Sequence, residues 1–178
     1  MSRARRSGLI IGLLCLVGCF GVRLLPAGPT HKTITVAYPK GQVFDAALLQ
    51  AYAMNLDVKV IERDSGLMRF ETALLSPASM EQYCVYPLQP VTCSAAPRSF
   101  TKAEQLGVGG SGTLSISILV SSVSDDSSAV DVRSNGTTTI VLPVYGEGRV
   151  ARTIPVESNG KLEHDFLEGL GTRLQGQR

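Results

Sequence analysis

A short apolar segment behind a cationic start is the strongest constraint on what this chain can fold into. Arg3, Arg5 and Arg6 precede an uncharged stretch that covers residues 7–22. A basic start followed by an apolar segment of this kind is typical of an export signal. A membrane-spanning helix needs about 20 apolar residues, so a permanent anchor here would be short. We therefore expect the first residues to direct export, and the rest of the chain to form the fold.

The end of the apolar segment, Leu16-Val17-Gly18-Cys19, resembles the lipobox of bacterial lipoprotein signals. The resemblance implies that the chain is cut before Cys19 and that Cys19 carries acyl chains such as palmitate, which attach it to membrane lipid. No Ala-x-Ala site for ordinary cleavage lies nearby, although an ordinary cleaved signal or an uncleaved short anchor is the alternative. Phe20, in place of Asp, favours the outer membrane by the same resemblance, with the protein facing the periplasm.

Charge limits the possible partners. The chain has 17 basic and 15 acidic residues, and removing the three signal arginines leaves 14 basic residues. The mature chain is therefore close to neutral and has no basic stripe, so we expect no nucleic-acid partner. We expect a signal peptide at 1–18, a lipidated N-terminus and tether at 19–32, and a single domain at 33–175.

Two cysteines remain after the signal and the lipidation site are set aside. Cys84 and Cys93 are separated by eight residues, and in an oxidising envelope such a pair usually forms a disulfide. On the chain-entropy model, closing this loop stabilises the fold by roughly 2.5–3 kcal/mol. A metal site is the weaker interpretation, because the only histidines of the chain are His31 and His164. We expect no metal and no cofactor.

Hydrophobic periodicity predicts the secondary structure. Alternating or β-rich segments indicate strands, and helical spacing of apolar residues indicates two amphipathic helices. The expected strands are 33–38, 58–62, 67–75, 114–120, 130–133 and 137–144, and the expected helices are 42–54 and 162–174. Residues 76–111 show no period, Asn135-Gly136 is a strong hairpin signal, and Asn159 is the expected cap of the last helix. The pattern predicts an α+β fold: a mainly antiparallel sheet of about five to six strands with both helices on one face.

Three motifs suggest chemistry but have simpler explanations. The glycines of 107–112 match a dinucleotide fingerprint, but that site needs a helix after the glycines and here a strand follows. His164 beside Asp165 lies in the expected last helix, and no serine sits on a nucleophile elbow. Glu62, Asp64 and Glu71 flank one expected hairpin, and we interpret them as surface charges. We therefore expect no catalytic residue and no enzyme.

One resemblance extends over about half the mature chain. Its motifs are listed in chain order: Val43-Phe44-Asp45-Ala46-Ala47-Leu48, Val58-Lys59-Val60, Asp64-Ser65-Gly66-Leu67-Met68 and Glu157-Ser158-Asn159-Gly160-Lys161-Leu162-Glu163. This helix-strand-turn-strand pattern with a final helix resembles small envelope lipoproteins. It is distantly similar to the α/β domains of the C-subunit lipoprotein of the outer-membrane β-barrel assembly machine. The resemblance implies a non-catalytic envelope role, and it transfers no functional residue.

The sequence thus predicts a membrane-anchored envelope lipoprotein with a protein-interaction or assembly role. Its predicted partners are membrane lipid, through acylated Cys19, and another envelope protein, for which 76–111 is a candidate docking loop. The alternative is a periplasmic carrier or sensor that binds a small apolar ligand between sheet and helices.

Overall fold

The computed structural model describes residues 22–24, 30–90, 99–107, 109–144 and 148–176. These residues form β1 (Val22–Leu24), β2 (Thr30–Val36), α2 (Lys40–Ala53), β3 (Asp57–Glu62), β4 (Leu67–Glu71), α3 (Pro77–Tyr83), β5 (Cys84–Val85), β6 (Leu88–Pro90), α4 (Phe100–Gln105), β7 (Gly109–Ser124), β8 (Ser127–Val144), β9 (Gly148–Ser158) and α5 (Lys161–Gln175). Among these residues, no helix has both the length and the apolar character that crossing a membrane requires.

Seven strands form one antiparallel sheet, and β8 is its longest member. The order is β3-β4-β7-β8-β9-β5, and β2 also pairs with β8. Strand β7 pairs with β8 along one side. On the other side of β8, β2 pairs with residues 128–134 and β9 pairs with residues 136–144. The α+β class is confirmed, with seven strands where the sequence predicted five to six.

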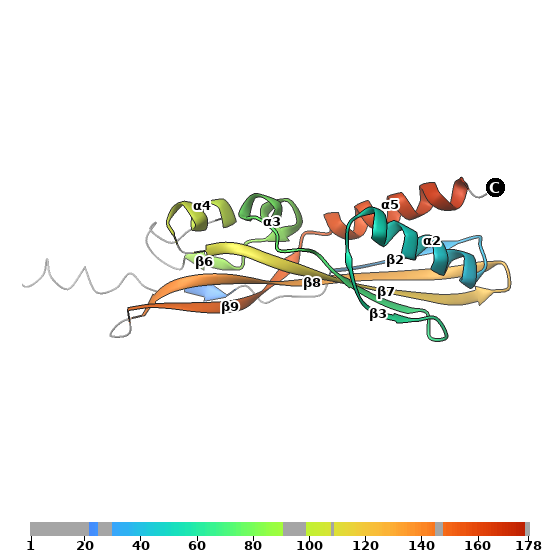
Figure 1. The fold of residues 1–178 in the computed structure, drawn as a ribbon, viewed down its shortest axis with the longest axis horizontal. Coiled ribbons are helices and arrows are strands. Elements are labelled where there is room, and N and C mark those ends of the chain that lie inside the picture. Colours follow the sequence, from blue (N-terminus) through green and yellow to red (C-terminus); the bar gives the residue numbers. More distant parts are fainter. Residues whose placement is uncertain (1–21, 25–29, 91–98, 108, 145–147, 177–178) are drawn as a thin grey trace, which may run out of the picture.

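All four described helices lie on one face of this long sheet (Figure 1). Alternate residues of β7, including Leu114, Ile116 and Ile118, are fully buried against the helical layer. The residues between them, among them Ser115 and Ser117, point to the opposite side. We call this helix-free side of β4, β7, β8, β9 and β2 the open face.

The two longer helices pack together over one half of the sheet, as their apolar spacing predicts. In α5, the residues at four-residue intervals from Leu162 to Leu174 are buried. Gln50 of α2 accepts a hydrogen bond from Arg173 Nε at 2.8 Å. Gly169 leaves room for this contact, because a Cβ there would lie 2.0 Å from the Gln50 amide nitrogen.

The prediction of an irregular segment at 76–111 is wrong for most of its described residues. It contains α3, β5, β6, α4 and the start of β7. Each short helix begins at a serine whose hydroxyl accepts a backbone N–H: Ser76 from Ser79, and Ser99 from Lys102. These helices have two turns or fewer, so their apolar residues are too few to show a helical period.

The predicted hairpin at Asn135-Gly136 is also wrong, because both residues lie inside the continuous strand β8. Gly136 is needed for packing and not for a turn: a Cβ there would lie 2.5 Å from the Leu114 side chain and 2.7 Å from the Thr113 carbonyl oxygen. The turn between β7 and β8 follows Ser124, in the interval between the expected strands 114–120 and 130–133.

Two further segments differ from expectation. Residues 148–158, which lie between the expected strand 137–144 and the expected helix 162–174, form β9, whose Ile154, Val156 and Ser158 are buried. Within the expected tether, Val22–Leu24 forms β1 and pairs with β6, and β2 begins at Thr30. The first domain strand therefore starts before the predicted boundary at residue 33.

Candidate functional site

The residues predicted from the cysteine pattern are only partly described. Cys19 and Cys93 lie outside the described residues, so lipidation and the Cys84–Cys93 disulfide stay predictions. Cys84 is a buried free thiol at the start of β5. Burial, and after it the nearby charge of Glu163, raises the pKa of this thiol to about 12.

The side chains considered for catalysis are not brought together. His164 is exposed on α5 and lies 3.9 Å from Glu168, and Asp165 pairs with Lys161 on the same helix. Glu62 and Glu71 lie at opposite ends of the β3–β4 hairpin, because Glu62 is paired with Leu67. Within the described ranges, no three His, Cys, Asp or Glu side chains gather closely enough to hold a metal ion.

The glycines of 107–112 serve strand packing. Gly109 and Gly110 open β7 with positive φ angles of 94° and 127°. A Cβ at Gly109 would lie 2.3 Å from the Thr139 carbonyl oxygen, and one at Gly110 would lie 2.6 Å from that of Phe100. The segment therefore holds β7 against β8 and α4, and a strand follows it as the sequence predicts.

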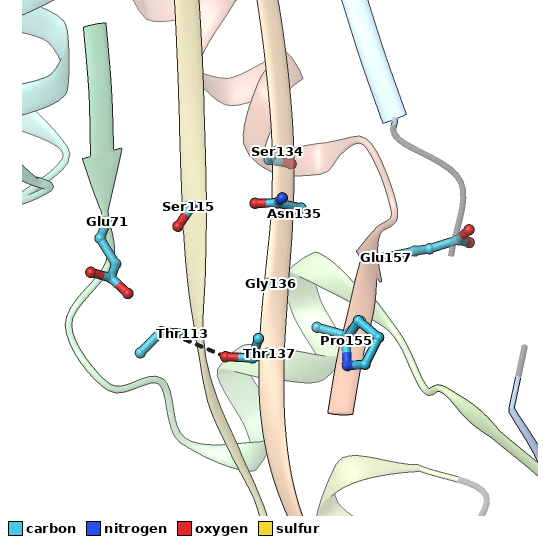
Figure 2. Close-up of a pocket in the computed structure, with 10 residues that line it drawn as sticks. Glu71, Thr113, Ser115, Ser134, Asn135, Gly136, Thr137, Pro155 and Glu157 are labelled. Carbon is cyan, nitrogen blue, oxygen red and sulfur yellow. Dashed lines mark hydrogen bonds between the residues drawn. The ribbon is translucent and has the colours of Figure 1, made fainter. Parts of the chain in front are cut away.

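A hollow of about 510 Å³ on the open face could receive a partner (Figure 2). Its lining residues come from four neighbouring strands: Glu71, Thr113, Ser115, Ser134, Asn135, Gly136, Thr137, Pro155, Val156 and Glu157. Figure 2 shows Glu71 and Glu157 at opposite sides of it, with small hydroxyl and amide side chains between them. Polar side chains therefore line a hollow that is open to solvent.

Strand register arranges the charges of the open face in two adjacent rows. The first, which we call the acidic row, contains Glu71, Ser115, Asn135 and Glu157. The second, which we call the basic row, contains Arg69, Ser117, Arg133 and His31, paired in this order from β4 to β2. On each of β4, β7 and β8 one residue separates the members of the two rows, so the rows lie side by side on the same face.

Ion pairs hold several of these charges in place. Lys59 Nζ lies 2.9 Å from Glu71, and its hydrogen bond lowers the pKa of that carboxyl. Arg133 binds Asp131 through two nitrogens at 3.1 Å, and this hydrogen bonding lowers the pKa of Asp131. Both carboxylates are therefore ionised well below neutral pH. A second hollow, of about 360 Å³, lies between Arg69 and Arg133.

A buried carboxylate supports the sheet beneath the hollow. Glu163, in the first turn of α5, is fully buried. Ser158 Oγ donates to Glu163 Oε2 at 2.8 Å, and the hydroxyl of Ser134 donates to Oε1. Ser158 Oγ in turn accepts the N–H of Gly160 at 3.0 Å. This cluster ties α5 to β8 and β9 at the point where the β8 partner changes from β2 to β9.

The hollow, the two rows and the Glu163 cluster could not be predicted from the sequence. The alternation of Thr113, Ser115 and Ser117 with buried residues indicated a polar strand face. Nothing in the sequence indicated which residues of other strands lie beside them. Comparisons with known protein families, with curated proteins and with solved structures find no match for this chain.

Proposed function

We propose that this chain is an envelope lipoprotein, anchored through acylated Cys19, that binds a protein partner on the open face and catalyses no reaction. The observation that carries the proposal is the pair of oppositely charged rows around a shallow polar hollow. The lipobox at Cys19 supports the anchor, and Phe20 supports an outer-membrane position facing the periplasm.

The size of the open face suits a protein better than a metabolite. The rows cross β4, β7, β8 and the β2 or β9 strand beside it, and strands lie about 4.8 Å apart, so each row is roughly 15 Å long. Strands β7 and β8 continue beyond the rows in both directions, so the open face is larger than the rows themselves. Because its side chains stand on a hydrogen-bonded sheet, their spacing is fixed before binding.

The charges define the partner chemistry. A matching surface presents carboxylates opposite Arg69 and Arg133, and basic side chains opposite Glu71 and Glu157. At Arg133 and Glu71 these partner groups join the ion pairs with Asp131 and Lys59. Such complementarity guides the encounter and sets the orientation of the bound partner. The hydroxyl groups of Ser115 and Ser117 offer hydrogen bonds and leave room for close approach.

The carrier alternative fits the geometry less well. An apolar ligand between sheet and helices would need space that is filled here by large buried side chains: Phe44, Phe70, Phe100, Phe166, Met68 and Met80. The two hollows described above lie on the other side of the sheet, and charged side chains line both of them. The observations therefore favour docking over carriage.

Photo-crosslinking in intact cells tests the docking proposal. A photoreactive residue in place of Ser117 on the open face is expected to give a discrete protein adduct. The same residue in place of Glu168, exposed on α5, is the matched control and is expected to give none. The double variant Arg69→Glu, Arg133→Glu should abolish the adduct while membrane association is kept. An adduct only from position 168 would assign the docking site to the helical face.

Intact mass of the membrane-extracted protein tests the anchor. We expect loss of residues 1–18 and the mass of acyl chains on Cys19. The Cys19→Ser variant should be unprocessed and free of acyl chains. An unmodified chain that begins at Met1 in the wild type would contradict the anchor.

A further inference from the structure

The two ends of this elongated molecule differ. α3, α4 and β6 lie at one end, and α2, α5 and β3 lie toward the other (Figure 1). β1 pairs with β6 in the register Val22↔Pro90, so the first described strand belongs to the α4 side. We call the part built from α3, α4, β1 and β6 the anchor end.

Chain length places the anchor end close to Cys19. Val22 follows Cys19 by three residues, and each residue spans at most about 3.6 Å, so the two Cα atoms are separated by no more than roughly 11 Å. The β7–β8 turn lies far away along the same axis, because β7 has 16 residues and each strand residue rises about 3.3 Å. A lipid on Cys19 therefore brings one end of the sheet to the bilayer and leaves the other end distant.

The charged residues are unevenly distributed along the long axis of the sheet. The described residues of the anchor end and of the adjoining strand halves (22–24, 77–90, 99–107, 109–112, 137–144 and 148–156) contain four basic and two acidic residues. The other described residues contain eight basic and twelve acidic residues. Anionic lipid attracts the first part and repels the second. At the anchor end, Lys102 lies on α4 and Leu106, which follows this helix, is 45% exposed.

We propose that the anchor end lies against the anionic surface of the membrane that holds Cys19, with Lys102 and Leu106 at the lipid headgroups. This inference rests on the proposed lipid anchor. It gives the domain one orientation: the long axis of the sheet leads away from the bilayer, and the β7–β8 turn is its distal point. The open face then stands beside the membrane and stays accessible to a protein partner.

Tryptophan fluorescence can test this orientation, because the chain contains no tryptophan. Leu106→Trp reports on the anchor end, and Val123→Trp, at a residue 61% exposed beside the distal turn, is the matched control. Each full-length variant is produced in bacteria, extracted from membranes and reconstituted into phosphatidylcholine–phosphatidylglycerol vesicles that contain brominated acyl chains. We expect about a twofold loss of emission from the Leu106→Trp variant, since an interfacial apolar side chain reaches the acyl boundary. Emission from the Val123→Trp variant should not change.

Vesicle flotation, measured first, separates the anchor from the orientation. Protein that does not float with the vesicles contradicts the proposed lipid anchor itself. Floating protein in which neither tryptophan is quenched, or in which Val123→Trp is quenched as strongly as Leu106→Trp, overturns the proposed orientation. The Lys102→Glu change, made in the Leu106→Trp background, should reduce quenching in anionic vesicles and leave flotation unchanged. Equal quenching with and without this change would contradict the role of charge.

Discussion

Replacing Glu163 by alanine tests whether one buried carboxylate holds the helical layer on the sheet. Its two oxygens accept the hydroxyl groups of Ser134 and Ser158, which are themselves buried. Glu163→Ala leaves both hydroxyls without their acceptor, and each buried unsatisfied polar group costs about 1–3 kcal/mol. It also removes a negative charge from the N-terminal turn of α5, where an anion is favourable. We expect a loss of about 3 kcal/mol in the free energy of unfolding.

Thermal unfolding followed by circular dichroism measures this loss on the detergent-extracted protein. For a domain of 150–250 residues, 1 kcal/mol shifts the melting temperature by roughly 2–4 °C, so Glu163→Ala should lower it by about 6–12 °C. Glu163→Gln keeps one acceptor oxygen and should lose about half as much, because bonds to the charged form are roughly twice as strong. Glu168→Gln, at an exposed position on the same helix, is the control and should have no effect. A melting temperature for Glu163→Ala within about 2 °C of that control, on the same scale, would refute the reasoning.

Three further substitutions and one chemical modification test other contacts. Gly136→Ala should destabilise the domain by about 1–3 kcal/mol in urea unfolding, because its Cβ would lie 2.5 Å from a leucine methyl group. A Cβ at Gly171 would meet no atom within 4 Å, so Gly171→Ala should stabilise the domain by up to about 1 kcal/mol. Hydrogen bonds from the hydroxyl and the backbone amide of Thr101 lower the pKa of Glu81 below its ordinary 4.5. These hydrogen bonds therefore stabilise the fold above pH 4.5, and their contribution is lost as the pH falls through the lower pKa of the folded state. Glu81→Gln should therefore lower the melting temperature at neutral pH, and the difference from wild type should disappear in acid. Burial raises the pKa of the Cys84 thiol from 9 to about 12, so the folded protein has about a thousandfold less thiolate at pH 8. After reduction, Cys84 should therefore be alkylated far more slowly in the folded protein than in urea. Equal alkylation rates would contradict its burial.

Elements with a strong local pattern could be predicted from the sequence. The buried residues of α5 recur every four positions, and those of β7 alternate with small polar residues. Both patterns arise because one side of the element faces the core, so the residue period records the structure directly. The β3–β4 hairpin is confirmed for the same reason, with Asp64 and Ser65 in its turn.

Elements that depend on distant partners could not be predicted. Asn135-Gly136 has a strong local preference for a turn, but β7 on one side, with β2 and β9 on the other, hold it extended. Pro155 and Gly148 are typical of a loop, yet Pro155 lies in β9. Among the described strands, β9 has a partner along only one side for most of its length. A proline is tolerated in a strand with such an open edge.

The two charged rows depend on strand register, and this explains why the candidate site could not be predicted. Arg69 and Glu71 are separated by one residue, as are Arg133 and Asn135, and each pair shares a face wherever its strand is placed. Whether Arg69 lies level with Arg133 is decided only by the pairing of both with Ser117. A slip of β4 by two residues would keep every apolar residue in the core and place Glu71 beside Arg133, which would mix the rows. Hydrophobic patterning excludes slips by one residue but not by two, so the charge order of the open face is a property of the assembled sheet.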